Sequence, residues 1–315
     1  MRFLIIAALL WIASATPAMG ASAPAGQPVR PGRVEVGLYL LNLGGLDTGT
    51  GTYTMDLYLS FHCDRPCDPS HFEIMNGRVT HSVAVDNKSQ QKVFRIQAAL
   101  VAPINLRDYP FDSHKLSFII EDGNVAARGA LGQTIDEQIY LVDPTRTAVS
   151  PLVQVTGWTV DPHWRAATSD NVYPTFKEIY SRYEFSLRIV RPLLTAVLKV
   201  LLPAIFLVIV GLLGLLLAPD KVTQRLTVGT SALVGSVLLH LNLTSTIPPV
   251  GYLTFADKFM LINYVPLVLA VAATVWMLWL TDRKQDARAH RVHIISGVVI
   301  PVVWIALQGV NLLTL

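Results

Sequence analysis

The chain has 315 residues, of which 52% are hydrophobic and only 15% are charged, and its mean hydropathy is +0.45. This composition is typical of a membrane protein, and the hydrophobic residues are concentrated after Arg191. The formal net charge of +3 is too small and too scattered to indicate nucleic acid as a partner.

Residues 1–20 have the pattern of a secretory signal peptide. The basic residue Arg2 precedes a short apolar run, and the small residues Ala18 and Gly20 predict cleavage near Gly20 or Ala21. An uncleaved anchor is the alternative, but the apolar run is short for a membrane span. We therefore expect the following segment to lie outside the inner membrane, in a periplasm.

Both cysteines, Cys63 and Cys67, fall in this exported segment, between His62 and His71. An oxidising compartment favours a disulfide that closes the short, proline-containing loop. A zinc site is the sharper alternative, because two histidines and two cysteines flank one tight turn. Free thiols are the third possibility. We favour the disulfide, and we expect no metal and no cofactor.

The segment 21–191 has the pattern of an all-β extracellular domain. After an Ala-, Pro- and Gly-rich leader, runs rich in Val, Leu, Tyr and Thr alternate with polar, Gly and Pro stretches. This regular spacing predicts an immunoglobulin-like β-sandwich. The expected strands cover residues 34–43, 52–63, 78–85, 92–103, 114–122, 138–143, 155–164 and 179–190.

Four apolar stretches follow in the segment 192–315, and each can span a bilayer, which needs about 20 residues. They predict an all-α transmembrane domain of four helices. Prolines inside the stretches are tolerated, because neighbouring helices satisfy the backbone groups that a proline frees. The expected helices cover about residues 192–217, 223–245, 254–281 and 291–315.

Basic residues in two of the loops set the orientation in the membrane. The loops that contain Lys221 and Arg225, and Arg283 to Arg291, are expected in the cytoplasm. This topology predicts a multi-pass protein of the inner membrane with both the N-terminal domain and the C-terminus on the periplasmic side. The outer link Thr246–Tyr252 then faces the β-domain, and its two prolines make it a stiff lever.

The second apolar stretch has one patterned face. Steps of three and four residues place hydroxyl, then apolar, then hydroxyl side chains on one side of a helix. Several copies around an axis would form a tube with polar ends and a hydrophobic constriction, which can gate by dewetting. A helix buried in a bundle is the alternative. The face consists of Thr227, Ser231, Val234, Leu238, Leu241 and Ser245.

The segment Ala102–Leu116, APINLRDYPFDSHKL, resembles the signature loop of the pentameric ligand-gated ion channels, the Cys-loop receptor superfamily. The Tyr-Pro-Phe-Asp core is present, and Ala102 and Leu116 stand where eukaryotic members have cysteines, as in bacterial members. Further stretches are similar to the proton-gated and amine-gated bacterial channels, so the resemblance covers almost the whole mature chain in order. They are residues 37–60, 156–160, 181–194 and 243–254.

The resemblance implies a homopentamer around a central pore lined by the second membrane helix of each subunit. In that arrangement Val234 matches the central hydrophobic gate, with Leu238 and Leu241 on its outer side. Thr227 and Ser231 match polar rings in the narrow cytoplasmic half. The implied function is a ligand-gated ion channel that works among membrane lipids and passes inorganic ions.

The resemblance also implies that the signature loop presses on the link after the pore helix. Asp47, Asp112 and Arg191 match a buried charge cluster, in which two carboxylates can share one guanidinium. Phe111 is expected near the linker, and ordinary packing of a tight turn is the alternative for Phe111 and Pro110. The remaining coupling residues are Tyr109, Pro110, Pro248, Pro249 and Tyr252.

Ion selectivity depends on the cytoplasmic mouth of the pore. Cation-selective members usually have a glutamate there, whereas this chain has the uncharged Thr223 or Gln224. Arg225 matches a position that often faces away from the lumen. The resemblance to the bacterial members implies that this chain passes monovalent cations. An anion-selective channel of the same family and a membrane-anchored periplasmic sensor are the alternatives.

The ligand site is expected between adjacent β-domains, where members of the family use aromatic boxes and cation–π attraction. Core or loop packing is the alternative for each candidate. Protons are the rival to a small-molecule agonist, because histidine titrates in the accessible range and the chain has eight. The candidates for the agonist site are Phe61, His62, Tyr173, Phe176 and Tyr180.

The chain is not expected to be an enzyme. It contains no G-x-S-x-G, Walker A or H-E-x-x-H motif. The membrane region also shows no inverted repeat of broken helices, which argues against a secondary transporter.

Overall fold

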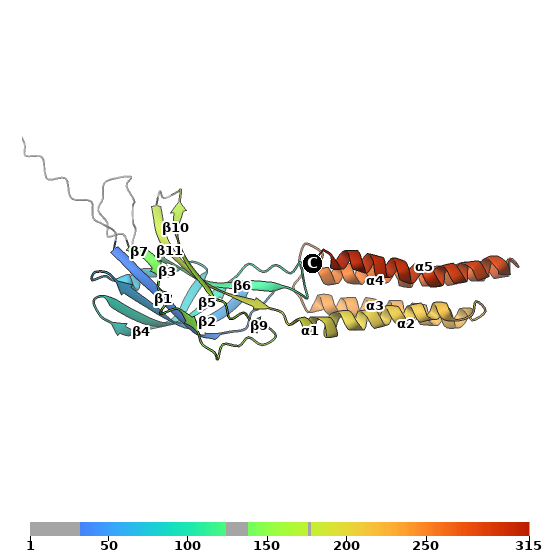
Figure 1. The fold of residues 1–315 in the computed structure, drawn as a ribbon, viewed down its shortest axis with the longest axis horizontal. Coiled ribbons are helices and arrows are strands. Elements are labelled where there is room, and N and C mark those ends of the chain that lie inside the picture. The colour runs from blue at the N-terminus through green and yellow to red at the C-terminus, as the bar shows by residue number, and fades with distance from the viewer. Residues whose placement is uncertain (1–31, 124–137, 176–177, 315) are drawn as a thin grey trace, which may run out of the picture.

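The computed structural model describes residues 32–123, 138–175 and 178–314. A β-rich part and a bundle of long helices lie end to end along the longest axis of the molecule (Figure 1). The predicted signal peptide over residues 1–20 and the candidate ligand residue Phe176 lie outside the described residues.

Two sheets form the β-rich part. One has the strand order β4-β5-β2-β1-β7 with β8 beside β1, and the other has the order β10-β11-β6-β3 with β9 beside β11. The strands of the first sheet are β1 Gly32–Leu43, β2 Thr52–Cys63, β4 Gly77–Asn87, β5 Gln91–Val101, β7 Gln138–Val142 and β8 Ala148–Val149. Those of the second are β3 Phe72–Ile74, β6 Ser113–Asp122, β9 Thr159–Val160, β10 Arg165–Tyr173 and β11 Glu178–Val190.

The core lies between the two sheets because each strand turns alternate side chains inward. In β2, every second residue from Tyr53 to Cys63 is buried. The facing strand β11 contributes Tyr183, Phe185 and Leu187 to the same cluster. The predicted all-β sandwich is thereby confirmed.

In the described part of the chain, four helical segments are long and apolar enough to cross a membrane. The first contains a π-turn directly before Pro203, where a regular α-helix would bring the proline ring against a preceding carbonyl. Its pieces are α1 Leu193–Ala196, η2 Val197–Leu201, α2 Leu202–Leu213 and η3 Gly214–Leu216. The other three are α3 Val222–Ser245, α4 Phe255–Asp282 and α5 Asp286–Leu312.

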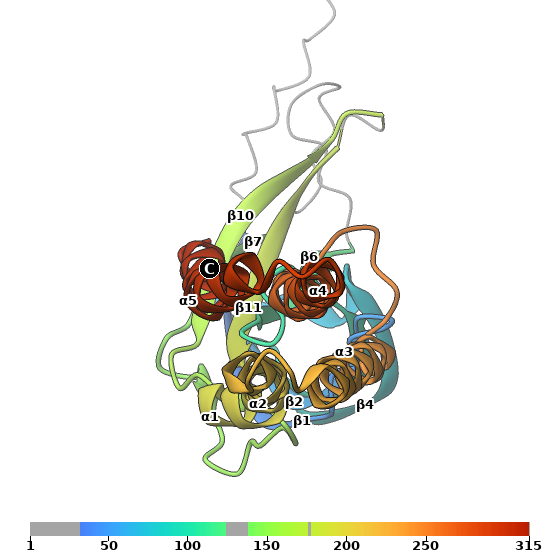
Figure 2. The same cartoon turned by 90° about the vertical axis from the view of Figure 1, so that its right-hand side faces the viewer.

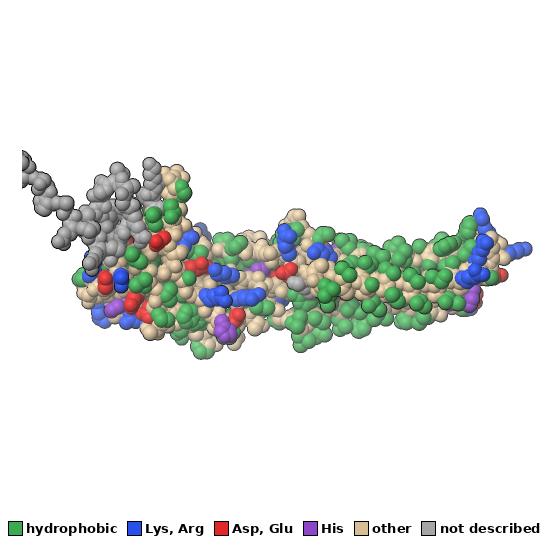
Figure 3. All heavy atoms as spheres, turned by 45° about the horizontal axis from the view of Figure 1, so that its top comes forward, with side chains coloured by type: hydrophobic (Ala, Val, Ile, Leu, Met, Phe, Trp, Pro, Cys, Tyr) green, Lys and Arg blue, Asp and Glu red, His purple; other side chains and the backbone are tan. Residues whose placement is uncertain are grey.

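The helices form a four-cornered bundle when viewed along their axes (Figure 2). The outside of the bundle is apolar along most of its length, with charged side chains gathered at the two ends (Figure 3). Val298 and Ile305 on α5, for example, are 61% and 63% exposed. An apolar outer surface of this extent suits hydrocarbon rather than water.

A polar contact joins α4 to α5 inside the bundle. The amide oxygen of the fully buried Asn263 accepts hydrogen bonds from Trp304 Nε1 and Gln308 Nε2, both at 2.8 Å. Gln308 Nε2 also donates to the carbonyl of Phe259 at 3.1 Å. Hydrogen bonds of this kind hold α5 in register on α4.

We expect Trp304→Phe to destabilise the folded chain by about 0.6 kcal/mol, and at most about 1.7 kcal/mol, the range measured for such bonds between membrane helices. The substitution removes one donor and keeps an aromatic ring. Thermal unfolding of the purified chain in detergent measures the effect. Trp276→Phe is the matched control, since Trp276 is 57% exposed, and an equal loss in both variants would contradict the prediction.

Candidate functional site

An ion pair joins the start of β6 to the end of β11, at the junction with the helices. Ser113 pairs with Val190 in the sheet, so the next residues outward, Asp112 and Arg191, lie opposite one another. Arg191 Nε donates to Asp112 Oδ1 at 2.7 Å and Nη2 donates to Oδ2 at 3.1 Å. The Asp112 side chain is 1% exposed and that of Arg191 is 23% exposed. This two-pronged geometry is the strong form of a charge-assisted hydrogen bond.

Three rings surround this ion pair. His114 Nε2 lies 2.8 Å from Asp112 Oδ2. The Arg191 guanidinium lies over the rings of Trp158 and Tyr109, at 4.4 and 5.0 Å from their centroids. His114 in turn meets Trp158 edge to face at 5.1 Å. We call Asp112, Arg191, His114, Trp158 and Tyr109 the joint cluster.

Burial acts to raise the pKa of Asp112, but the hydrogen bond from His114 and the Arg191 guanidinium outweigh it, so the pKa is lowered from 3.8. A carboxyl with a lowered pKa stabilises the fold above its ordinary pKa. That contribution is lost as the pH falls below about 4 and passes through the lowered value.

We therefore expect Asp112→Asn to be less stable than the parent at neutral pH, and to approach it in stability as the pH falls toward about 2. Thermal unfolding across this pH range measures the difference. Asp86→Asn, at a carboxylate bonded to the exposed Lys88, serves as the control. A gap between Asp112→Asn and parent that stays constant with pH would show that this carboxyl does not contribute in the expected way.

The sequence analysis expected Asp47 to share the Arg191 guanidinium with Asp112, but the structure places Asp47 elsewhere. Its carboxylate closes its own turn, accepting from Gly49 N at 2.7 Å and from Thr50 Oγ1 at 2.8 Å. These hydrogen bonds, with Thr50 first, lower the pKa of Asp47. An Asp two residues before a Gly favours this local turn. Among the described residues, Arg191 is thus bonded to one carboxylate, that of Asp112. Asp112 has His114 as its second side-chain partner.

The signature loop is hydrogen-bonded directly to the membrane helices. The carbonyls of Arg107 and Tyr109 accept from the backbone N–H groups of Phe255 and Ala256, at 2.7 and 3.0 Å. The first N–H groups of a helix have no partner within the helix, so the loop satisfies two of these donors of α4. The Tyr109–Pro110 peptide bond in this loop is cis.

Two tyrosines add side-chain contacts between the same segments. Leu106 N donates to Tyr252 Oη at 2.9 Å. Tyr109 Oη lies 3.3 Å from Thr246 Oγ1, at the C-terminal end of α3. The loop therefore contacts the end of α3, the link and the start of α4 together.

Phe111 and the two linker prolines have different partners from one another. The Phe111 ring packs edge to face on Phe255 at 5.4 Å, in a cluster that includes Tyr252. Pro248 and Pro249 instead line a cavity of about 220 Å³ with the β1–β2 turn, residues 48–51. Phe111 is therefore in one cluster with the linker residue Tyr252, as expected, and its ring contact is with Phe255 on α4, whereas the β1–β2 turn faces the two prolines.

The patterned face of α3 is on the outside of the single chain. Val234, Leu238 and Leu241 are 57%, 61% and 61% exposed. Thr227, Ser231 and Ser245 are also exposed. The opposite side packs into the bundle through Arg225, Gly229, Ala232, Ser236 and Leu243.

Two polar residues fasten the inner side of α3. Arg225 is 2% exposed, and its Nη1 donates to the Leu217 carbonyl at 3.3 Å and lies 3.2 Å from His293 Nδ1. It therefore points away from the patterned face. Near the other end, His240 lies 2.8 Å from Tyr264 Oη and 3.2 Å from Asp257 Oδ1, both on α4.

The structure separates the candidates for the agonist site. Phe61 is fully buried in the sandwich core, so its assignment to a ligand site was wrong; it has the same inward alternation as Leu57 and Leu59. His62 is exposed on the other face of β2. These two residues therefore do not share a surface.

Tyr173 and Tyr180 do come together, edge to face at 5.5 Å. They line a cavity of about 320 Å³ with Glu73, Met75, Glu121, Asp122 and Gly123. Tyr173 Oη donates to Glu121 Oε2 at 2.9 Å, and Arg182 Nε donates to the other oxygen at 2.7 Å. The cavity combines aromatic faces with carboxylates, which suits a small cationic ligand.

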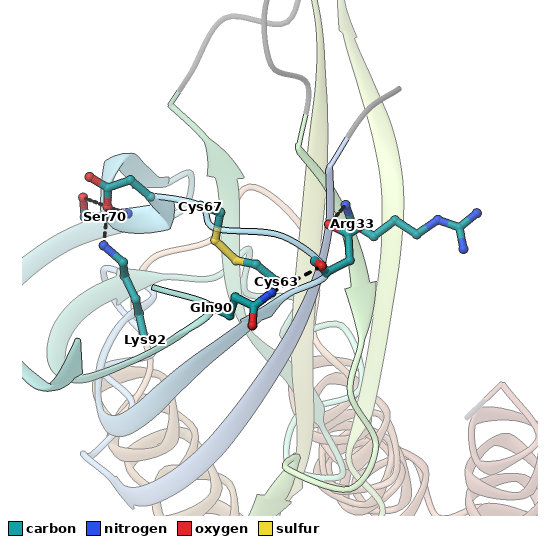
Figure 4. Close-up of a disulfide and its surroundings, with 8 residues drawn as sticks. Arg33, Cys63, Cys67, Ser70, Gln90 and Lys92 are labelled. Atoms are coloured by element: carbon teal, nitrogen blue, oxygen red, sulfur yellow. Dashed lines mark hydrogen bonds and ion pairs between the residues drawn. A yellow bond between two sulfur atoms is a disulfide. The ribbon is translucent and has the colours of Figure 1, made fainter. Parts of the chain in front are cut away.

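Cys63 and Cys67 are joined as a disulfide (Figure 4). The loop they close is bonded to the turn after β4, through Cys63 N to the Gln90 carbonyl at 2.8 Å and Cys67 N to the Ser89 carbonyl at 3.1 Å. A disulfide leaves no thiolate for zinc. Among the described residues, no cluster of three or more His, Cys, Asp or Glu is placed to hold a metal.

The sequence analysis gave no role to two residues of this region, Trp158 and Phe255, and named Thr246 only as the first residue of the link. Trp158 stood in a stretch already compared with the family, but its side-chain direction toward Arg191 depends on tertiary structure. Thr254 and Asp257 form a capping box at the start of α4, a signal that marks Phe255 as the first helical residue.

No family model matches the chain. A search of characterised proteins found similarity to a proton-gated ion channel of Gloeobacter violaceus (strain ATCC 29082 / PCC 7421). The two are 23% identical over 302 residues, which cover 87% of this chain and 81% of the relative. The similarity therefore extends over both the sandwich and the helices. This similarity and the β-sandwich followed by four helices able to cross a membrane fit the architecture of a prokaryotic pentameric channel, and they support a multi-pass membrane protein with an extracellular N-terminal domain.

Proposed function

We propose that five copies of the chain form a cation channel in the inner membrane, with the patterned face of α3 around the pore. The observation that carries this proposal is the bonding of the signature loop to α3, the link and α4. Movement of the β-sandwich would reach the pore helix through these contacts. A ligand that binds the open arrangement more tightly would shift the population toward it.

Thr227 and Ser231 form the polar rings in this proposal, and Val234, Leu238 and Leu241 form the hydrophobic barrier. Their exposure in the single chain leaves them free to line a shared axis. The C-terminus lies on the periplasmic side, since an even number of spans follows an exported domain. Monovalent cations remain the favoured ions, on the basis of the bacterial family members.

Protons are the stimulus that we favour. The relative is named a proton-gated channel, and two histidine–carboxylate pairs of this chain lie at the coupling region. His114 contacts Asp112 in the joint cluster, and His240 connects α3 to Asp257 on α4. A small cation that enters the cavity of Tyr173 and Tyr180 is the second candidate, supported by the aromatic and acidic lining.

Single-channel recording tests the proposal. The purified chain is reconstituted in planar bilayers, and the outer pH is stepped from about 7.5 to about 4.5, across the ordinary range of histidine and carboxyl groups. We expect unitary currents that increase in frequency at low pH. A KCl gradient then gives the selectivity from the reversal potential. If neither acid nor a panel of amines evokes unitary currents, the membrane-anchored sensor becomes the better explanation.

A further inference from the structure

A cavity of about 480 Å³ lies on the solvent side of the β10-β11-β6 sheet, toward the end that meets the helices. It is separate from the cavity of Tyr173 and Tyr180, and the proposed gating does not use it. Basic side chains gather on the sandwich on the side toward the helices (Figure 3). The lining residues are Ser113, His114, Lys115, Asp161, His163, Arg165, Ser186, Leu187 and Arg188.

The strand register brings the basic residues of this cavity together. Arg188 on β11 is directly opposite Lys115 on β6, and Arg165 on β10 is directly opposite Ser186. Ser186 and Arg188 are two residues apart on one strand, so all four side chains are on the same face. Directly opposite like charges destabilise a sheet, so the pair of Arg188 and Lys115 requires a compensating negative charge.

The protein itself supplies only part of that charge. Lys115 Nζ lies 2.6 Å from Glu184 Oε1. Asp161 Oδ1 accepts a hydrogen bond from the backbone N–H of His163 at 2.9 Å and lies 2.8 Å from Nδ1 of the same residue. With Glu184 included, three permanent cations, Lys115, Arg165 and Arg188, face two carboxylates, Glu184 and Asp161, which leaves an excess of one positive charge.

The floor of the cavity offers hydroxyl groups. Arg188 donates to the neutral Ser113 Oγ through Nε at 3.2 Å and Nη2 at 2.7 Å. Because that hydroxyl accepts from Arg188, its own proton is left to donate. Ser186 lies between Arg165 and Ser117 across the sheet, but its hydroxyl donates to the Arg165 carbonyl at 3.5 Å, so the hydroxyl proton available to a ligand is that of Ser113. The Ser113 hydroxyl, with guanidinium and ammonium groups at the rim, matches the donors that an oxyanion needs.

We propose that this cavity binds a phosphate-class oxyanion, held by Arg188 and Arg165 with Lys115 at the edge. The bound anion would neutralise the facing Arg188 and Lys115, and so brace β6 against β11. Ser113 and His114 line the cavity and directly follow Asp112 in the chain, so the bound anion would lie beside the joint cluster. Its influence on gating rests on the proposed function, but the binding itself does not.

The phosphate group has two possible sources, a dissolved anion and a lipid headgroup. Arg188 precedes the first helical residue, Leu193, by five positions, which is at most about 17 Å of extended chain. Leu193 and Leu194 are 66% and 71% exposed, as at the edge of the hydrocarbon. The headgroup layer beyond that edge is only about 5–8 Å thick. This upper limit is compatible with both sources, so the lipid arm of the experiment distinguishes them.

Thermal unfolding of the full chain in a neutral detergent tests the site, with inorganic phosphate titrated against chloride at constant ionic strength. Phosphate stabilises many proteins through exclusion from their surfaces, so only a saturable shift counts. We expect such a shift for the parent. Arg188→Gln should weaken it by about tenfold or more in apparent affinity, because a charge-assisted hydrogen bond is lost.

Arg165→Gln provides a second variant in case Arg188→Gln folds poorly, and should weaken phosphate binding in the same direction. Lys88→Gln, at an exposed lysine paired with Asp86, is the matched control and should bind like the parent. A shift that does not saturate, or one of equal apparent affinity in both arginine variants and the parent, overturns the proposal. Failure of the channel recordings would leave this readout unaffected.

A second arm separates the two sources. The chain is placed in nanodiscs of phosphatidylcholine alone or with phosphatidylglycerol, in a buffer that contains no inorganic phosphate. If phosphatidylglycerol stabilises the parent but not Arg188→Gln, the site takes its oxyanion from a lipid headgroup. If dissolved phosphate stabilises the parent but not Arg188→Gln, and phosphatidylglycerol has no such effect, the oxyanion comes from solution. If neither stabilises the parent in an Arg188-dependent manner, the cavity is not an oxyanion site.

Discussion

Arg191→Ala is expected to abolish stimulus-evoked current and to destabilise the chain by about 3–5 kcal/mol, the usual cost of breaking a buried ion pair. The substitution leaves the Asp112 carboxylate, whose side chain is 1% exposed, without its bidentate partner. It also removes the cation between the Trp158 and Tyr109 rings. Current density in cells and thermal unfolding of the purified variant give the two measurements.

The controls for this prediction separate folding from coupling. Arg191→Lys keeps the charge but lacks the planar fork, so we expect an intermediate loss of both stability and current. Lys88→Ala removes an exposed lysine far from the joint cluster and should behave as the parent. Asp112→Ala should resemble Arg191→Ala. Normal evoked currents in both Arg191→Ala and Asp112→Ala would refute the coupling role.

Val234→Thr is expected to raise the current at rest by about tenfold or more. The change is nearly isosteric but replaces a methyl group with a hydroxyl, which lowers the barrier to wetting of a hydrophobic constriction. A hydroxyl in place of a methyl changes the local free energy by roughly 0.5–2 kcal/mol, and 1.4 kcal/mol is a factor of ten. In the proposed pentamer, five copies act on one ring. Macroscopic recording without stimulus measures this leak.

Val298→Thr on α5 is the matched control for the pore substitution. Val298 is 61% exposed and Val234 is 57% exposed, so the two changes are alike in chemistry and in exposure in the single chain. Val298 is on the apolar outer surface of α5, which suits hydrocarbon. Comparable leak from both variants, or from neither, would contradict the assignment of Val234 to the gate.

Periodicity in the sequence was sufficient to predict the architecture. Alternation in the strands and long apolar stretches indicated a sandwich followed by four helices, and both parts are present. The same alternation could have corrected the error at Phe61, because it has the inward phase of Leu57 and Leu59. The local Asp-Thr-Gly-Thr sequence at Asp47 likewise contained a turn signal that favoured its own backbone.

The contacts between the two parts were harder to predict, because they join residues far apart in the chain. Tyr109 and Thr246 are 137 positions apart, and Leu106 and Tyr252 are 146 apart. Spacing in a sequence determines which residues share a face of one element, but not which faces meet. The family resemblance brought the loop and the link to the same region. It did not distinguish Phe255 from the two prolines as the partner of Phe111.

The bonds from the Arg107 and Tyr109 carbonyls to the start of α4 are made by the main chain alone. Alanine scanning leaves such bonds intact, so it would understate how firmly the loop is attached to the helix. Two homologues with different side chains could keep the same attachment, since every residue except proline has the required N–H. Replacement of the Phe255 or Ala256 amide with an ester, which removes one donor and keeps the side chain, is the perturbation suited to this attachment.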